Sequence, residues 1–303
     1  MSTRGWVLFS AMCVIWGVPY LLIKVAVEEM SPSVLVLGRT VVAAALLLPL
    51  AAARGELRPL RARLLLLLVF AVVEIAVPWV LLGAAETELS SSLTALLISA
   101  TPLVAVLVAL ATRQRDGFGL HTAIGLALGV AGVAAIVGVN LEGAGVAPLV
   151  QVGLVAVCYA VGPAILQRWL SDLPSYGVIA VSLAATAVIY APIAAFQLPD
   201  ERPSTEALLS VLGLALVCTA LAFVVFFALI AEVGPVRATV ITYVNPAVAA
   251  VLGVAILDEH FTVGMGVGFV LVLLGSVLAT RSSRRAPGAT LEPAYEAPEP
   301  TAR

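Results

Sequence analysis

Most of this sequence consists of apolar runs of about 20 residues, and this feature restricts the fold more than any motif does. A helix of that length crosses the hydrocarbon core of a bilayer, since each residue adds about 1.5 Å of rise. Of the 303 residues, 62% are hydrophobic and 11% are charged, which is too little charge to cover a soluble domain. We therefore predict that lipid is the solvent for most of the chain.

A scan of the sequence with a window of about 19 residues predicts the membrane spans. The ten predicted spans lie near 5–27, 34–53, 63–83, 90–111, 118–139, 147–168, 175–196, 207–230, 236–257 and 263–280. An open sheet leaves backbone groups unpaired in lipid, and these runs lack the period-two alternation of a barrel. The predicted fold class is therefore an all-α polytopic membrane protein with ten transmembrane helices.

The charges in the loops predict the orientation, because cytoplasmic loops are rich in arginine and lysine. One set of loops and span ends carries Arg54, Arg58, Arg61, Arg63, Arg113, Arg115, Arg168, Arg237, Arg281, Arg284 and Arg285. The alternate loops carry Glu28, Glu29, Glu86, Glu88, Glu142, Asp200, Glu201, Glu206, Asp258 and Glu259, with Arg202 as their only basic residue. This alternation predicts a multi-pass protein of the cell membrane with both termini in the cytoplasm. The stretch 282–303 is rich in Pro, Ala and Glu and is predicted to be a disordered cytoplasmic tail.

The two halves of the chain repeat each other weakly but in the same order. For example, SATPLVAVLVAL at 99–110 aligns with YVNPAVAAVLGV at 243–254, proline on proline. The matches predict one five-helix repeat over residues 1–140 and a second over 146–281. Because five is odd, the second repeat enters the membrane from the opposite side. Such inverted repeats suit alternating access, since the two halves can exchange conformations.

A set of motifs along the chain resembles a known transporter family. The motifs are the WG..Y...K pattern of Trp16, Gly17, Tyr20 and Lys24, Arg39, the TP at 101–102, the GPVRA at 234–238, the NP at 245–246 and the LDE at 257–259. Over residues 6–280 the chain is similar to the EamA family of the drug/metabolite transporter superfamily. The resemblance implies ten transmembrane helices in two inverted repeats. It also implies secondary active transport, often export, of amino acids or related small metabolites.

The chain departs from the family pattern at one visible place. The family usually carries a glutamate beyond the conserved proline of each half. Glu259 has that position after Pro246, whereas Arg115 has it after Pro102. If the two glutamates serve the helix ends, the first repeat must do so in another way.

Three charged residues inside the predicted spans carry the site hypothesis, because a charge in lipid costs a few kcal/mol. Lys24 ends the first span, where it either pairs with Glu28 and Glu29 near the interface or belongs to the substrate path. Arg39 and Glu74 lie deeper, and we expect either a structural ion pair or the charged part of the transport site. An acid in mid-membrane also suits proton exchange, since burial disfavours the charged carboxylate, and this assigns proton coupling to Glu74.

Aromatic and polar side chains near the prolines of the spans complete the candidate substrate site. The predicted substrate-binding residues are Trp16, Tyr20, Lys24, Arg39, Glu74, Trp79, Thr101, Tyr159, Tyr243 and Asn245. Each uncharged member has an alternative role as a helix contact or an interfacial anchor. The small residues Gly125, Gly129 and Gly132 indicate close helix packing rather than ligand contact.

Signs of an enzyme are absent from the sequence. His121 and His260 lie on opposite faces of the predicted topology, and no phosphate loop or nucleophile elbow occurs. We therefore expect no catalytic residue, no metal, no cofactor and no nucleic acid. The expected partners are a small-molecule substrate and the lipid bilayer, and a homodimer stays open. Lys24 and Arg39 favour a solute with a carboxylate. The alternatives are a multidrug or lipophilic-cation exporter of the same fold and a non-transporting membrane protein.

Overall fold

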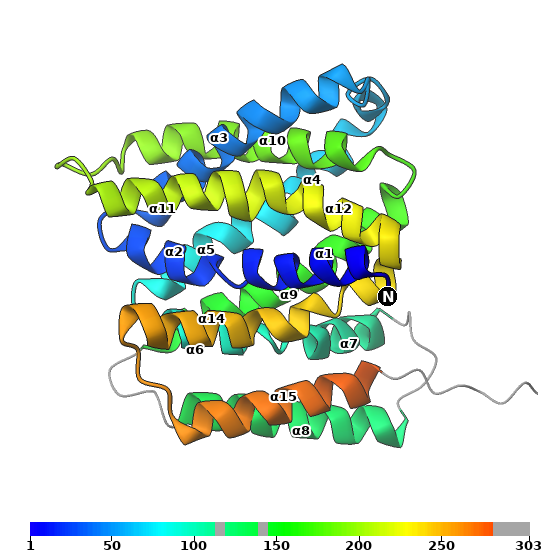
Figure 1. Ribbon diagram of the computed structural model, residues 1–303, viewed down its shortest axis with the longest axis vertical. Helices are drawn as coiled ribbons and strands as arrows, with labels where there is room; N and C mark the ends of the chain where they lie inside the picture. The colour runs from blue at the N-terminus through cyan, green and yellow to red at the C-terminus, as the bar shows by residue number, and fades with distance from the viewer. Residues whose placement is uncertain (113–118, 139–144, 281–303) are drawn as a thin grey trace, which may run out of the picture.

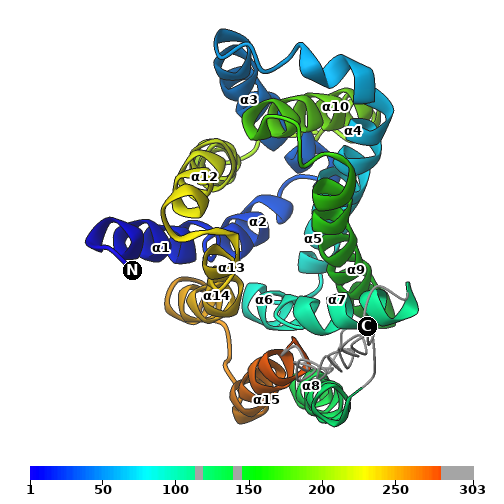
Figure 2. The ribbon, with the colours of Figure 1, turned by 90° about the vertical axis from the view of Figure 1, so that its right-hand side faces the viewer.

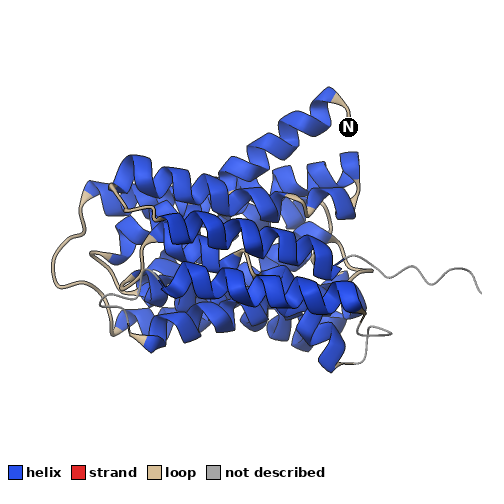
Figure 3. Ribbon diagram, turned by 90° about the horizontal axis from the view of Figure 1, so that it is seen from below, coloured by secondary structure: helices blue, strands red, loops and turns tan. Residues whose placement is uncertain are grey.

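A computed structural model describes residues 1–112, 119–138 and 145–280 of the chain. Within these ranges the elements are helices joined by short loops, and no strand occurs (Figure 3). Arg115 and the stretch 282–303 lie outside the described residues, so the predicted tail remains a prediction. The all-α class predicted from the apolar runs is confirmed.

The first half of the chain contains α1 (Thr3–Ile15), α2 (Pro19–Val27), α3 (Pro32–Ala53), η1 (Pro59–Arg63), α4 (Leu64–Ala71), η2 (Val72–Ala76), α5 (Val77–Glu86), α6 (Ser91–Ile98), α7 (Thr101–Ala111) and α8 (Leu120–Gly138). The second half contains α9 (Val146–Trp169), α10 (Ser175–Ala195), α11 (Thr205–Ala215), η3 (Leu216–Leu221), α12 (Ala222–Val233), α13 (Pro235–Ala238), α14 (Ile241–Leu257) and α15 (Val263–Thr280).

Among the described residues, nine helical segments are long and apolar enough to cross a membrane. They are Thr3–Val27, Pro32–Ala53, Pro59–Glu86, Ser91–Ala111, Leu120–Gly138, Val146–Trp169, Ser175–Ala195, Thr205–Val233 and Val263–Thr280. The remaining predicted span, 236–257, is shorter as a continuous helix, because α13 ends at Ala238 and α14 begins only at Ile241. The polytopic character predicted from the sequence is thus present, and the tenth apolar segment is the interrupted one.

Several spans change their helical geometry near the middle. The first span breaks before Pro19, which begins α2, and the fourth breaks before Thr101, ahead of Pro102. The third and eighth spans instead contain one π-helical turn each, η2 and η3. Such turns are rare and often occur at functional positions.

The helices run side by side, and the packed pairs follow a regular pattern. In Figure 1, α3 with α10 lies at one end of the long axis and α8 with α15 at the other. Between them α6 packs on α14, α5 on α9, and α1 on α12, as the end-on view in Figure 2 also shows. The packing of α5 on α9 corresponds to that of α1 on α12, and the packing of α7 on α9 to that of α1 on α14, which is consistent with inverted repeats. The repeat boundaries 1–140 and 146–281 remain predictions.

Glycines allow α8 and α15 to approach until their backbones touch. A Cβ added to Gly132 would lie 2.7 Å from the carbonyl oxygen of Gly268, and one added to Gly125 would lie 2.7 Å from that of Gly275. Contacts this short force a backbone shift, because neither carbonyl can move aside as a side chain can. The expectation that these glycines serve helix packing is confirmed.

We expect Gly132→Ala to destabilise the protein by about 1–3 kcal/mol, the usual cost of overpacking a close contact. Gly138→Ala, at the end of the same helix, is the matched control, because no described residue lies within 4 Å of a Cβ there. The measurement is the melting temperature of both purified variants in one detergent. Equal melting temperatures would contradict the close-packing explanation.

Candidate functional site

The guanidinium of Arg39 is held in the interior by two neighbouring helices. It stacks on the indole of Trp79 in α5, with Cζ 3.5 Å from the ring centroid. Its Nε donates a hydrogen bond of 2.8 Å to Oγ1 of Thr219 in η3. Arg39 is 8% exposed, so these contacts replace much of its hydration. The terminal guanidinium nitrogens make no hydrogen bond or ion pair with the described residues, so they are available to a ligand.

The π turn η2 carries Glu74, and its side chain reaches into space that a glycine leaves. A Cβ added to Gly162 of α9 would overlap the Oε2 atom of Glu74. This oxygen is buried and has no hydrogen-bond partner in the part of the chain that the structure describes. A buried acceptor without a partner costs about 1–3 kcal/mol and is most simply explained by a ligand or a proton.

Tyr159 of α9 lies near both charged groups and near the indole of Trp79. Tyr20, in α2, interacts with Tyr159 in turn. We name Arg39, Glu74, Trp79, Tyr159 and Thr219 the central site. It combines a cation, an acid and aromatic groups, which suits a dipolar solute with an apolar part.

Arg39 and Glu74 do not form the ion pair that the sequence led us to consider. Among the described residues, the ion pairs are Arg4–Glu232, Arg54–Glu56 and Arg63–Asp172. Arg39 stacks on Trp79 and donates to Thr219 instead, so of the two roles considered for Arg39 and Glu74 the structural ion pair is not formed. Their role in transport stays a prediction.

Lys24 also differs from expectation, because it binds main-chain carbonyls instead of the neighbouring acids. Its Nζ donates to the carbonyl oxygens of Glu86, at 2.7 Å, and Leu89, at 3.1 Å. Within the described chain it forms no ion pair with Glu28 or Glu29, which are exposed. The ammonium thus neutralises the negative end of α5, a neighbouring helix, where carbonyls lack intrahelical partners.

At the same end of the bundle, the negatively charged Glu259 binds the N-terminus of a helix. Its two carboxylate oxygens accept hydrogen bonds from the backbone N–H groups of Ser91, at 2.6 Å, and Ser92, at 2.9 Å. These are orphan donors at the start of α6, where the helix dipole favours an anion. A residue of one half of the chain therefore caps a helix of the other.

Of the remaining residues predicted to bind substrate, three make contacts with other parts of the protein and the fourth has no described contact with the central site. Trp16 packs on Phe226 and Phe223 of α12. Thr101 donates to the carbonyl of Ile98 in its own turn. Asn245, in the amide orientation that satisfies it, donates to the carbonyls of Cys13 and Ile241. Tyr243 is half-buried in α14 and has no side-chain hydrogen bond to the described residues.

Sequence reasoning missed Thr219 and Gly162, which support Arg39 and Glu74. The signal for Thr219 lies in the repeat itself. Glu74 and Thr219 occupy π turns in the third helices of the two halves. A comparison of spans three and eight would have placed a polar residue at the same depth in each. The room that Gly162 leaves depends on the approach of α9 to η2, which no local pattern encodes.

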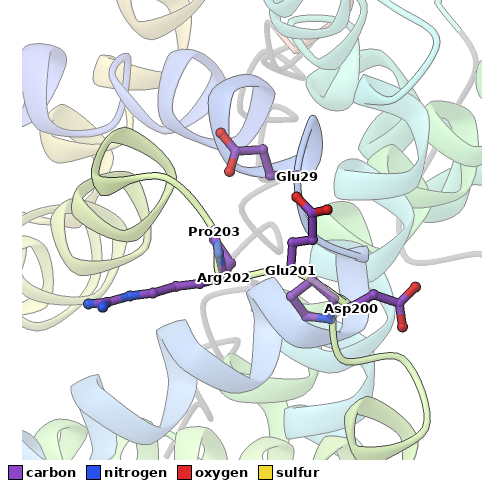
Figure 4. Close-up of a pocket in the computed structure, with 6 residues that line it drawn as sticks. Glu29, Asp200, Glu201, Arg202 and Pro203 are labelled. Carbon is purple, nitrogen blue, oxygen red and sulfur yellow. The ribbon is translucent and has the colours of Figure 1, made fainter.

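A cavity of about 360 Å³ lies on the loop between α10 and α11, where Glu29, Asp200, Glu201, Arg202 and two prolines line it (Figure 4). The Oε2 atom of Glu29 accepts from the Ser204 N–H at 2.6 Å, and this bonding keeps the pKa of Glu29 below its usual range. None of the lining residues belongs to the central site, so we do not assign the cavity to the substrate. In the described ranges no three His, Cys, Asp or Glu lie close enough to hold a metal ion.

Comparison with known proteins identifies relatives of this chain. Residues 3–138 and 149–281 each match the EamA-like transporter family. The uncharacterized inner membrane transporter YedA of Escherichia coli strain K12 is 29% identical over 285 residues, covering 88% of this chain and 90% of YedA. YedA of Escherichia coli O157:H7 gives the same values. A solved crystal structure with 20% identity has a TM-score of 0.64 and covers 92% of this chain and 97% of its own, which supports the fold alone.

We expect Gly162→Ala to displace the Glu74 carboxylate, because the added methyl group overlaps it. The variant should fold and lose most of its transport. Gly153→Ala in the same helix is the control, since nothing lies within 4 Å of a Cβ there. Transport rates of the two variants in proteoliposomes provide the test, and equal rates would show that the position of Glu74 is unimportant.

We expect Glu259→Ala to destabilise the protein by about 0.5–2 kcal/mol, the usual effect of removing a helix N-cap. His260→Ala changes the next residue, which is exposed, and should have little effect. Thermal melting in detergent measures both variants. If Glu259→Ala has the same melting temperature as the wild type, the two hydrogen bonds to α6 contribute nothing to stability.

Proposed function

Because this chain belongs to the EamA-like transporter family and is a membrane transporter, we propose that it exports amino acids or related small metabolites by proton exchange. The single observation that carries this proposal is the central site. Arg39 offers free guanidinium nitrogens, and Glu74 offers an unpartnered carboxylate oxygen beside the same aromatic groups. In the proposed mechanism, an α-carboxylate binds Arg39 and an ammonium group approaches Glu74. Trp79 and Tyr159 contact the apolar part of the solute.

Glu74 serves both the substrate and the proton in this proposal. The carboxylate binds an ammonium group, whereas the neutral acid does not, so a proton arriving at Glu74 releases the substrate. One proton therefore exchanges for one solute as the two halves of the protein alternate. The π turn supports this role, because it places the side chain away from regular helical packing.

A lipophilic cation is the alternative substrate of the same fold. Glu74 would attract it, but the guanidinium of Arg39 lies near the same tyrosine and opposes a second cation. A solute with both charges uses both groups. We therefore favour a dipolar solute, and the transport experiment also measures flux of a lipophilic cation.

The experiment is flux of labelled amino acids in proteoliposomes, with and without a pH gradient, for the wild type, Glu74→Gln and Arg39→Lys. We expect gradient-dependent flux in the wild type. Glu74→Gln should abolish its dependence on the gradient, and Arg39→Lys should raise KM because it loses the stacking and the bond to Thr219. Glu206→Gln, an exposed acid at the start of α11, is the control.

Each outcome of this experiment has a distinct meaning. Flux of a lipophilic cation with none of any amino acid would overturn the substrate class. Amino-acid flux that keeps its pH dependence in Glu74→Gln would overturn the assigned proton site. Size-exclusion profiles and melting temperatures show whether each variant is folded before its flux is interpreted.

A further inference from the structure

A second buried acid lies at the end of the bundle where α2, α5 and α14 end and α6 begins. Glu86, the last residue of α5, has an exposure of 0%, and neither of its carboxylate oxygens has a hydrogen-bond partner in the described residues. Desolvation of a carboxylate costs several kcal/mol unless it is paired. The central site does not use Glu86, so its burial requires another explanation.

Charged groups of both signs face Glu86 from neighbouring elements. Lys24 on α2 attracts it, Glu259 beyond α14 repels it, and Tyr20 on α2 is the other titratable group that interacts with it. The Lys24 ammonium is bound to the main-chain oxygens of Glu86 and Leu89, and it forms no ion pair with the Glu86 carboxylate among the described residues. Both oxygens of Glu259 are already bound to α6.

This geometry leaves an ionised Glu86 without compensation. The Lys24 ammonium donates to carbonyls, the Glu259 carboxylate is bound to α6, and the hydroxyl oxygen of Ser91 is also buried without a described partner. A neutral acid removes the uncompensated charge and needs no rearrangement. A proton from the solvent forms an O–H bond with the carboxylate, and water is the other product.

We propose that Glu86 is a second proton-binding site, and that its proton keeps α2 packed against the turn between α5 and α6. When Glu86 releases the proton, its carboxylate attracts Lys24, whose ammonium then leaves the carbonyls of Glu86 and Leu89. The contact between α2 and this turn weakens, and this end of the bundle, predicted to face outward, opens. The link to transport rests on the proposed function, but proton binding at Glu86 does not.

Infrared spectroscopy tests the proton directly. The C=O stretch of a protonated carboxyl group absorbs apart from that of a carboxylate and shifts in D₂O. We would record it for the full chain in lipid nanodiscs over a pH series, for the wild type, Glu86→Gln, Glu74→Gln and Glu88→Gln. Glu88 is the matched control, because it lies two residues further along the same turn and is exposed.

We expect a protonated carboxyl band near neutral pH whose Glu86 component is lost in Glu86→Gln and kept in Glu74→Gln and Glu88→Gln. A spectrum of Glu86→Gln identical to that of the wild type would overturn the site. If Glu86→Gln does not fold, Glu86→Asp replaces it, and the band must then shift its position or titration. No substrate is needed, so failure here is distinguishable from failure of the proposed function.

The opening step has its own measurement, because Lys24 is the only lysine in the chain. A membrane-impermeant amine reagent, followed by peptide mass analysis, reports the access to Lys24. Glu88→Gln should become faster to label as Glu86 loses its proton, whereas Glu86→Gln should stay slow at the same pH. Equal labelling of these two variants at every pH would overturn the opening step.

Discussion

Desolvation of polar groups in lipid is the constraint on which the rest of this structure depends. Lipid offers no hydrogen bonds, so every backbone group and every charge in a span must find its partner within the protein. The spans are helices, in which most backbone groups bond within the same segment. The same demand applies at helix ends, where backbone groups lack intrahelical partners. Lys24 binds carbonyl oxygens at the C-terminal end of α5, and Glu259 accepts hydrogen bonds from N–H groups at the N-terminal end of α6. These partners come from distant parts of the chain and join the two halves.

The central site supports its cation in part and leaves one oxygen of its acid without a described partner. Arg39 is supported by a ring, a hydroxyl group and no carboxylate. Glu74 occupies the space beside Gly162 with one oxygen unpartnered. If protein groups fully paired the charges of both Arg39 and Glu74, the site would have little affinity for a ligand or a proton. The incomplete support of Glu74 is therefore what favours a ligand or a proton at this position, as for Glu86 at the end of α5.

The paired π turns connect this chemistry to the architecture. Each third helix carries one, and each presents a polar side chain to the interior at that turn: Glu74 in η2 and Thr219 in η3. Arg39 donates a hydrogen bond to Thr219 in η3, and Tyr159 lies near both Arg39 and Glu74. A movement of one half against the other would change both contacts. The central site thus draws its residues from both halves of the chain.

The sequence by itself determined the solvent, the helical class and the approximate spans, because length and apolar content alone decide what can cross lipid. It also selected Arg39, Glu74, Trp79 and Tyr159, which the fold brings together, since charged and aromatic groups within spans are rare enough to stand out. Only the tertiary structure decided the partners. An ion pair with Glu74 was one of two roles considered for Arg39, which instead stacks on Trp79. Pairing with Glu28 and Glu29 was one of two roles considered for Lys24, which instead binds two carbonyls. Residue type sets the charge, but the approach of helices distant in sequence decides which partner meets it. For that reason the space beside Gly162 and the burial of Glu86 became visible only in three dimensions.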